Sequence, residues 1–446
     1  MMQSFKGVRR AGFAIAGVGL LAVAIAFPTS ASATGDVEGS QYLIPTALPA
    51  GVIDGNPAKE YQTGGNPPAA TSQALLQLTL DHPELRVAGT EWAAESGQLL
   101  LYSAADESVV DAALESAGLS DTIEYRPAVL DASQKSDLAQ QMTGIDGQLA
   151  SGHRVVSVEP SLDGSSLIVV LDEAVAARAR LAQPDLDPGE VAKAAGVEVK
   201  VEFGPAIEPA LRNHAANPST YSGAVMHRIG TSRACTTGWR MTQISGSVPV
   251  MASAHHCFEG VEGDAWGYTT IPGYPAANAY SIYGAGMSAG DVAVWKGGLP
   301  DHMLPGIFIG DHTVSGSGVY SVKGAVTSTV NGTVCYSGSF SGTVCNSTIL
   351  ATGVTACYGD GLPCYNNLTR TQQASGIPAA GSGDSGGPVY ATWNGIYAAG
   401  IISGVSNYST NCMGEPGGGG RVCSATVLYA PVSELMTNGY GLNYVP

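Results

Sequence analysis

Residues 381–390 read GSGDSGGPVY and place Ser385 at the centre of a Gly-Asp-Ser-Gly-Gly run. The pattern Gly-x-Ser-x-Gly is also the nucleophile turn of α/β-hydrolases, in which the catalytic histidine follows the serine along the chain. The eight histidines of this chain are His82, His153, His214, His227, His255, His256, His302 and His312. Because all of them precede Ser385, the α/β-hydrolase fold is excluded. The order histidine, aspartate, serine remains available for a catalytic triad.

A second informative stretch is MASAHHCFEG, residues 251–260, in which two histidines stand side by side before a cysteine. A general base beside a serine nucleophile also needs a carboxylate that orients its ring. Asp291, in AGDVAVW, opens an apolar run and is one candidate. Asp264 is its competitor, but it lies only a few residues after His256 in a glycine-rich turn.

Five motifs together resemble the chymotrypsin-like serine peptidases, and more closely the secreted bacterial streptogrisin and α-lytic type. The resemblance covers about residues 220–440, and GDSGGP is its most specific part. The motifs are ACTTGW at 234–239, SAHHC at 253–257, GDVAVW at 290–295, VCYSGSFSGTVC at 334–345 and GDSGGP at 383–388. The resemblance implies an all-β catalytic domain of two six-stranded antiparallel β-barrels.

The resemblance also implies a role for each residue of the site. The family's base directly precedes the cysteine, which makes His256 rather than His255 the expected base. Asp291 is then expected to orient His256, and Ser385 to be the nucleophile. The N–H groups of Gly383 and Ser385 are expected to form the oxyanion hole.

The aspartate of the GDSGGP motif, Asp384, is expected to lie buried beneath the serine loop. Bacterial relatives carry an arginine just after the cysteine of the Val-Cys motif as its partner. Here that position is Tyr336, so the counter-group of Asp384 stays open.

The resemblance places the substrate-binding pocket at Ala379, Ser403, Gly404 and Val405. Trypsin-like members carry an acidic residue where this chain has Ala379, so a Lys or Arg preference is not expected. Val405 stands where relatives that accept large side chains have glycine. We therefore expect cleavage after small or medium apolar residues, unless Val405 turns aside or the assumed register is shifted by one residue.

All eight cysteines lie between Cys235 and Cys423, which indicates disulfides in an exported protein. Zinc ligation is the alternative, but no Cys-x-x-Cys pair supports it. The resemblance implies the pairs Cys235–Cys257 and Cys335–Cys345. The pairing of Cys357, Cys364, Cys412 and Cys423 is open, with the local pairs Cys357–Cys364 and Cys412–Cys423 favoured.

The beginning of the chain predicts export. Lys6, Arg9 and Arg10 precede an apolar stretch, and Ala31-Ser32-Ala33 fits a cleavage site, so residues 1–33 are expected to be a signal peptide. The alternative is a membrane anchor, for which the apolar stretch is short. The 446 residues carry a formal net charge of −17 with only 13% charged residues. A nucleic-acid partner is not expected, because it calls for clustered Lys and Arg.

The two halves of the chain differ in character. Residues 1–215 carry 13 Lys and Arg against 27 Asp and Glu, whereas residues 216–446 carry 7 against 10. Residues 34–71 are rich in Pro, Gly and Ala and are expected to form a loose leader. Within residues 72–205, the runs 72–80, 107–118 and 133–152 have the apolar spacing of helices, and the runs 97–104, 153–160, 165–172 and 197–203 alternate or run apolar as strands do. These patterns predict an α+β region. From residue 216 onward, short apolar runs separated by turn residues predict an all-β domain.

The interpretation is a secreted, extracellular serine endopeptidase made as a zymogen. The resemblance implies that residues 34–215 are a pro-region that aids folding and blocks the site; the alternative is a domain retained in the mature protein. Residues 216–446 are the serine peptidase domain. We expect a monomer that acts on protein or peptide substrates, with no cofactor, no metal and no membrane contact after signal cleavage. Two alternatives remain: a protease-like binding protein without turnover, and an esterase on the same fold.

Overall fold

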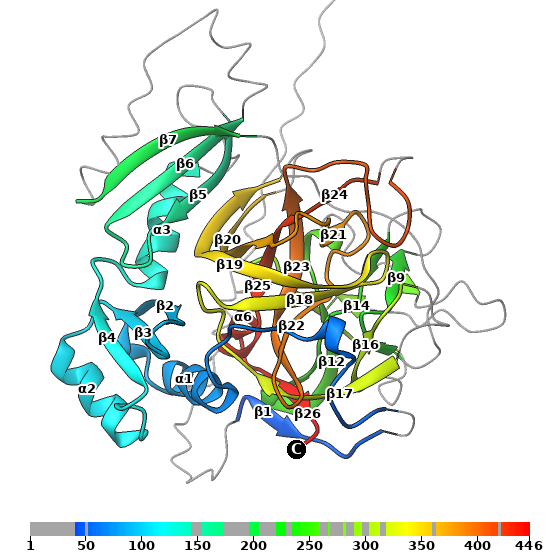
Figure 1. Cartoon of the computed structure of the whole chain (residues 1–446), viewed down its shortest axis with the longest axis horizontal. Helices are drawn as coiled ribbons and strands as arrows, with labels where there is room; N and C mark the ends of the chain where they lie inside the picture. Colours follow the sequence, from blue (N-terminus) through cyan, green and yellow to red (C-terminus); the bar gives the residue numbers. More distant parts are fainter. Residues whose placement is uncertain are drawn as a thin grey trace, which may run out of the picture. The chain divides into compact units, whose positions relative to one another are not determined.

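The computed structural model describes most of the chain (Figure 1). The described residues are 41–49, 52–143, 154–172, 196–204, 220–228, 234–258, 266–267, 280–281, 290–296, 303–312, 318–358, 363–417 and 421–446. The expected signal peptide lies outside these residues. Among them, no helix has both the length and the apolar character needed to cross a membrane.

Among the described residues, the expected α+β region contains three helices and two groups of strands. Helices α1 (Ala69–Asp81), α2 (Glu107–Ser116) and α3 (Ala132–Thr143) form where apolar residues recur at helical spacing. In α2, Val110 and Leu114 are four residues apart, so both face one apolar cluster with strand residues. The predicted third helix begins as expected, and its second half, residues 144–152, lies outside the described residues.

Four of the described strands of this region form in the predicted apolar runs, and two, Val87–Ala93 and Ile123–Pro127, lie outside those runs. One sheet has the order β2 (Val87–Ala93), β3 (Gln98–Ser103), β4 (Ile123–Pro127). A second group comprises β5 (Val155–Pro160), β6 (Ser166–Asp172) and β7 (Glu198–Gly204). Side chains of β6 alternate between buried and half-buried, as expected for a strand with one covered face.

The remainder of the described chain is dominated by strands. A twelve-stranded sheet has the order β7-β6-β5-β19-β18-β22-β23-β17-β16-β8, with β20 and β25 joined to it off this path. Its further members are β8 (Thr220–Ser222), β16 (Met303–Ile309), β17 (Gly318–Ala325), β18 (Thr333–Gly338), β19 (Gly342–Cys357), β20 (Cys364–Gln373), β22 (Pro388–Thr392), β23 (Ile396–Ser406) and β25 (Thr426–Pro431).

A six-stranded sheet has the order β1-β26-β11-β12-β15-β14, and two small sheets pair β10-β9-β13 and β21-β24. These strands are β1 (Leu43–Pro45), β9 (Val225–Arg228), β10 (Ala234–Thr236), β11 (Arg240–Gln243), β12 (Val248–Ser253), β13 (Trp266–Gly267), β14 (Tyr280–Ser281), β15 (Ala293–Lys296), β21 (Ala380–Gly381), β24 (Cys423–Ser424) and β26 (Tyr440–Tyr444). The short helices are η1 (Lys59–Tyr61), η2 (Pro83–Leu85), η3 (Ile244–Gly246), η4 (His255–Cys257) and α6 (Ser433–Thr437). The strand-rich character of this part is confirmed; the division into two closed six-stranded barrels stays a prediction.

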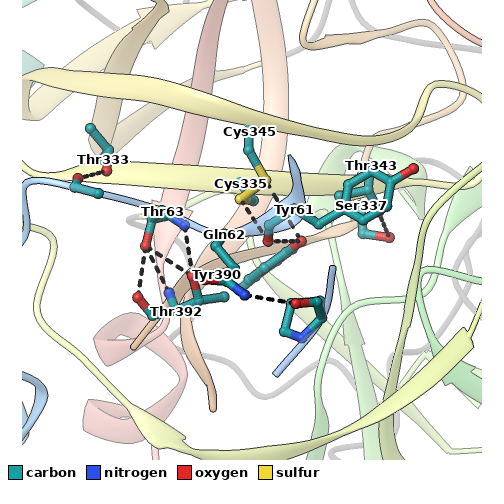
Figure 2. The surroundings of a disulfide bond; sticks show 12 residues. Tyr61, Gln62, Thr63, Thr333, Cys335, Ser337, Thr343, Cys345, Tyr390 and Thr392 are labelled. Atoms are coloured by element: carbon teal, nitrogen blue, oxygen red, sulfur yellow. Dashed lines mark hydrogen bonds between the residues drawn. A yellow bond between two sulfur atoms is a disulfide. The ribbon is translucent and has the colours of Figure 1, made fainter. Parts of the chain in front are cut away.

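Residues of the expected leader pair with the strand-rich part. Strand β1 lies parallel to β26, with Leu43 opposite Leu442. Figure 2 shows the segment around Tyr61 crossing the Cys335–Cys345 disulfide. Thr63 exchanges hydrogen bonds with Thr392, one of them from Thr63 N to Thr392 Oγ1 at 2.7 Å.

Strand β5 of the α+β region pairs with β19 of the strand-rich part, with Thr355 opposite Val158 (Figure 1). The Arg370 guanidinium on β20 lies 2.8 Å from the Glu159 carboxylate on β5. Apolar residues of β5 and β6 share a buried cluster with Cys357 at the end of β19. The long hairpin β19–β20 is therefore the main strand contact of the α+β region.

Four asparagines have backbone φ angles of 54° to 67°, in the left-handed region. Asn is the residue after Gly that occupies this region most readily, because its short polar side chain can hydrogen-bond locally. Each of the four begins an Asn-x-Ser/Thr triplet; they are Asn331, Asn346, Asn367 and Asn407. The left-handed backbone at these four positions is therefore sufficient to explain why asparagine stands there.

Candidate active site

His256 and Asp291 are in direct contact. His256 lies in η4 just after β12, and Asp291 lies just before β15. Because β12 and β15 pair antiparallel, with Ser253 opposite Ala293, the end of one strand meets the start of the other. His256 Nδ1 is 2.6 Å from Asp291 Oδ2, and the His256 backbone N–H donates to Asp291 Oδ1 at 2.9 Å.

Asp291 is fully buried, and its carboxylate is held by three donors. Besides the two from His256, Ser403 Oγ donates to Asp291 Oδ2 at 2.6 Å. Burial by itself raises the pKa of Asp291, but the charge of His256 and the hydrogen bonds from His256 and Ser403 outweigh it and lower the pKa below its ordinary value. The buried site therefore favours an ionised carboxylate beside the imidazole.

Ser385 lies in a tight turn between β21 and β22. The next residue, Gly386, has φ of +87°, and a Cβ there would lie 2.0 Å from Ser253 Oγ and 2.3 Å from Thr236 O. Only glycine fits this position, which brings the serine turn against the end of β12, close to η4. The Ser385 N–H and the Gly383 N–H donate no hydrogen bond to any residue that the structure describes.

The Ser385 hydroxyl makes no hydrogen bond to the His256 imidazole in this structure. Ser385 Oγ lies 3.5 Å from the Ser403 carbonyl oxygen. In the described part of the chain His256 Nε2 is a buried nitrogen without a hydrogen-bond partner. The structure thus joins His256 to Asp291, and no residue that it describes forms a hydrogen bond with His256 Nε2 or with the N–H groups of Gly383 and Ser385.

The counter-group of Asp384 is Arg421, which sequence reasoning missed. An Arg421 guanidinium nitrogen lies 3.6 Å from Asp384 Oδ2, and both side chains are buried. Ser341 Oγ bridges the two, donating to Asp384 Oδ2 at 2.5 Å and accepting from Arg421 at 2.9 Å. Tyr336 instead contacts Thr371. The available signal was that Arg421 is the last Lys or Arg of the chain and lies two residues from a cysteine.

The Asp384 carboxylate is also held by backbone N–H groups. Phe340 and Ser341 each donate to Oδ1 at 3.0 Å, and Gly381 donates to Oδ2 at 2.8 Å. A Cβ at Gly338 would lie 2.0 Å from Asp384 Oδ1. Gly338 is therefore required, because the Asp384 carboxylate beneath the Ser385 turn occupies the space that any side chain at position 338 would need.

His255 points to a different neighbour. Its Nδ1 lies 2.8 Å from the Tyr365 hydroxyl oxygen on β20, and the two rings meet edge to face at 5.5 Å. Adjacent histidines on η4 thus contact different partners: His256 contacts Asp291, and His255 contacts the β19–β20 hairpin.

Of the residues expected to line the pocket, Ser403 lies beside Ser385, with its carbonyl oxygen 3.5 Å from Ser385 Oγ. Ala379 and Val405 belong to one buried apolar cluster, together with Ala380 and Ile402. Ser403 donates to Asp291, and Gly404 lies against the ring of Tyr358. Val405 is therefore buried in the same cluster as the alanines that precede the Ser385 turn.

Four disulfides are present, and they are the pairs named from the sequence: Cys235–Cys257, Cys335–Cys345, Cys357–Cys364 and Cys412–Cys423. Cys235–Cys257 ties β10 to η4, which carries His256. In the described ranges, no group of three His, Cys, Asp or Glu residues could hold a metal ion.

No protein-family profile and no curated protein matches this chain. Among solved structures, its neighbours are bacterial chymotrypsin-like serine proteases, a class of hydrolases. A glutamic acid specific serine protease, described as using a histidine triad in substrate binding, is 23% identical with a TM-score of 0.36 and covers 50% of this chain and 98% of its own. Nocardiopsis protease is 24% identical with a TM-score of 0.36, covering 50% and 97%. Thermobifida fusca protease A is 23% identical with a TM-score of 0.34, also covering 50% and 97%. At these values the likeness does not assign an activity to this chain.

Proposed function

We propose that this protein is a secreted serine endopeptidase made as a zymogen, with Ser385 as nucleophile, His256 as base and Asp291 as the residue that orients the base. The observation that carries this proposal is the buried 2.6 Å contact between His256 Nδ1 and Asp291 Oδ2, beside a serine turn with two unused N–H groups. A buried carboxylate on Nδ1 leaves Nε2 free to accept a proton, as a base requires.

The chemistry begins when the Ser385 side chain rotates from Ser403 O toward His256 Nε2. Nε2 takes the hydroxyl proton as Oγ forms a bond to the carbonyl carbon of the peptide. Asp291 stabilises the imidazolium, and the N–H groups of Gly383 and Ser385 stabilise the oxyanion. The carbon–nitrogen bond then breaks, and His256 returns the proton to the leaving amine. Water repeats the sequence on the acyl-enzyme and releases the carboxylic acid and free Ser385.

We further propose that the enzyme cleaves after small or medium apolar residues. The support is the position of Val405 in the same buried cluster as Ala379 and Ala380. A branched apolar side chain at position 405, with alanines at 379 and 380, brings no charge to the slot and leaves less room in it than glycine would. A Lys, Arg, Asp or Glu side chain would lack a partner there, at a high cost in free energy.

The chain organisation belongs to the same proposal. Residues 1–33 are the signal peptide, residues 34–215 the pro-region, and residues 216–446 a peptidase domain of two six-stranded barrels. The pairing of β5 with β19 supports a pro-region that guides folding, because it covers the hairpin next to the site. Folds dominated by long-range strand pairing form slowly, since the entropy of closing long loops is lost before the contacts form. The proposed mechanism uses only side chains and backbone groups of the chain.

The test is labelling of the secreted, matured protein with a fluorophosphonate probe, with the modified peptide mapped by mass spectrometry. We expect label on Ser385. His256→Ala should abolish the labelling, because the serine then lacks its base, whereas His255→Ala should retain it. His255 is the matched control, since it is the adjacent histidine on the same short helix.

Absence of label on correctly processed, folded protein would overturn the proposal and favour a protease-like binding protein without turnover. Equal loss of label in both histidine variants would contradict the assignment of the base. Labelled protein that hydrolyses esters but cleaves no peptide would favour the esterase alternative.

A further inference from the structure

Two described stretches, residues 41–49 and 52–66, run along strands of the proposed peptidase domain, and we call them the strap (Figure 1). Strand β1 of the strap lies at the end of the six-stranded sheet, where it pairs with β26. The Leu442 N–H donates to Tyr42 O at 2.7 Å, and the Thr46 N–H donates to Tyr444 O at 2.8 Å. The strap therefore adds a strand to this sheet, which is a common way for an extended peptide to bind a protein.

The middle of the strap continues along β17. The Ile53 N–H donates to Val319 O at 2.7 Å, and the Ser321 N–H donates to Ile53 O at 2.9 Å. The Asp54 carboxylate accepts from Ser321 Oγ at 2.9 Å and lies 2.5 Å from Lys323 Nζ. Backbone pairing and an ion pair thus fix this part of the strap against the same strand.

The last residues of the strap bind the start of β18 and the end of β22. Asn66 uses one side-chain amide to satisfy both backbone groups of Thr333: its Nδ2 donates to Thr333 O at 3.0 Å, and its Oδ1 accepts from the Thr333 N–H at 2.6 Å. The Thr392 N–H donates to Thr63 Oγ1 at 2.9 Å. Figure 2 shows this end of the strap, with Thr63 against Thr392 and Tyr61 beside the disulfide. The hydrogen-bond partners of the strap named so far therefore lie on β17, β18, β22 and β26.

Gly441, on β26, leaves the space that the strap occupies. A Cβ at Gly441 would lie 2.6 Å from Ile44 Cδ1, 2.9 Å from Ile44 Cγ1 and 3.1 Å from Gln41 O, and all three atoms belong to the strap. The backbone of Gly441 is outside the left-handed region, so its φ angle does not require glycine. The strap, rather than the fold of β26 itself, therefore excludes a side chain at this position.

We infer that the strap binds residues 216–446 directly and stays on them as a separate chain after the α+β region has been cut away. The strands that hold it all belong to residues 216–446. Without the strap, β26 would become an exposed sheet edge with unpaired N–H and C=O groups, which natural proteins avoid. None of the contacts named involves His256, Asp291 or Ser385, so a bound strap leaves the proposed triad as it is.

The inference rests on the proposed chain organisation and changes one part of it. The strap lies inside residues 34–215, the proposed pro-region, yet it belongs to the mature enzyme. The mature enzyme therefore consists of two chains, a short one that contains the strap and a long one that contains the triad.

The first test uses the full-length Ser385→Ala protein, which lacks the proposed nucleophile, with a recognition sequence for a site-specific protease inserted between Asn66 and Ala69. After cutting, we expect the strap to co-elute with the rest of the chain in size-exclusion chromatography, with both chains identified by intact mass. Asn66→Ala should raise the dissociation constant of the strap about ten-fold or more, because two hydrogen bonds to Thr333 are lost. Asn56→Ala is the matched control: it makes the same change within the strap at an exposed residue and should leave the dissociation constant near wild type.

A variant on the other partner tests the same contact. Gly441→Ala should also weaken binding of the strap, because the new Cβ meets Ile44, and adding Ile44→Ala should recover part of the loss. Release of the strap from the cut protein at micromolar concentration would overturn the inference. Equal dissociation constants in Asn66→Ala and Asn56→Ala would overturn it as well.

The second test is the intact mass of the secreted, matured protein under denaturing conditions. We expect two chains, the shorter of which contains the strap. A single chain that begins near residue 216 in folded, matured protein would overturn retention of the strap. A protein that keeps the strap but takes no fluorophosphonate label would count against the proposed function alone.

Discussion

At the scale of single residues, the buried carboxylate of Asp384 is paired with an arginine, but this arginine comes from a different position of the chain than the motif predicts. The sequence has Tyr336 where an arginine is expected, and the cation comes from Arg421 instead. Burial lowers the pKa of Arg421, while the charges of Asp384 and Glu415 oppose this shift. Arginine stays protonated under such conditions because its ordinary pKa lies far above neutrality. The Ser385 turn therefore rests on a complete ion pair.

Replacing Arg421 with Met should damage both stability and activity. A buried carboxylate left without its cation typically costs about 3–5 kcal/mol. We expect a lower midpoint in urea unfolding and a loss of fluorophosphonate labelling rate of at least about ten-fold, because the loop that presents Gly383 and Ser385 loses its support. Adding Asp384→Asn to Arg421→Met should recover stability, since the unpaired charge is gone.

Arg240→Met is the control for the Arg421 variant. Arg240 is also a largely buried arginine, but its guanidinium hydrogen-bonds to the backbone carbonyls of Met303 and Met241. It should lower stability and leave the labelling rate near wild type. Equal loss of labelling in both variants would show that Arg421 acts only through global stability.

At the scale of elements, strand β23 brings several parts of the site together. Its residue Ser403 reaches Asp291, the adjacent Gly404 gives room to Tyr358, and Val405 belongs to the same buried apolar cluster as Ala379. The register shift in its pairing with β25 lies between Ile402 and Gly404. One strand therefore links the proposed triad, the buried Tyr358 ring and the proposed pocket.

Val405→Gly should widen the proposed pocket. We expect the ratio of kcat/KM for peptides with Phe before the cleaved bond to those with Ala to rise about ten-fold or more, because each pocket methylene is worth about 1–3 kcal/mol. Val427→Ala is the control, since Val427 lies opposite Val405 in the same apolar cluster but on β25. An unchanged ratio in Val405→Gly, or a wild-type profile dominated by Phe, Tyr or Arg, would contradict this pocket.

At the scale of the whole described molecule, the α+β region and the strand-rich part are joined by a strand pairing and by an ion pair. The residues of β19 that pair with β5 are Thr355 and Ala356, which come just before the Cys357–Cys364 disulfide at the tip of the hairpin. Tyr358 is the residue directly after Cys357. The Glu159–Arg370 ion pair fixes the same contact. The paired residue Ala356 stands two positions before Tyr358, whose ring stacks on the His256 imidazole.

A charge swap tests this contact in the full-length Ser385→Ala protein, which lacks the proposed nucleophile. Glu159→Arg should lower the thermal midpoint, because two cations then meet at the interface. Adding Arg370→Glu should recover most of the loss, with a coupling of about 1 kcal/mol. Glu202→Arg, at the exposed pair with Lys200, should have little effect. No recovery in the double variant would show that the pair does not hold the region to the hairpin.

The sequence by itself determined the features that depend on local pattern and chain order. Helical spacing predicted α1, α2 and the start of α3, and alternating apolar runs predicted β3, β5, β6 and β7. The positions of the histidines relative to Ser385 excluded one fold, and the motifs identified His256 and Asp291 as a pair that the structure then brought into contact. These signals are readable because each depends on a few neighbouring residues.

Only the tertiary structure decided which distant groups meet. Arg421 and Asp384 are far apart in the chain and touch because the pairing of β21 with β24 places them together. Tyr358 reaches His256 because the long hairpin β19–β20 extends to that side of the site. No local pattern encodes such contacts, since they arise from strand pairings between segments with no fixed spacing in sequence. The physical reason is that a buried polar group needs a hydrogen-bond partner, and the whole fold decides which partner is near. An arginine or a hydroxyl can come from any strand that ends beside the buried group.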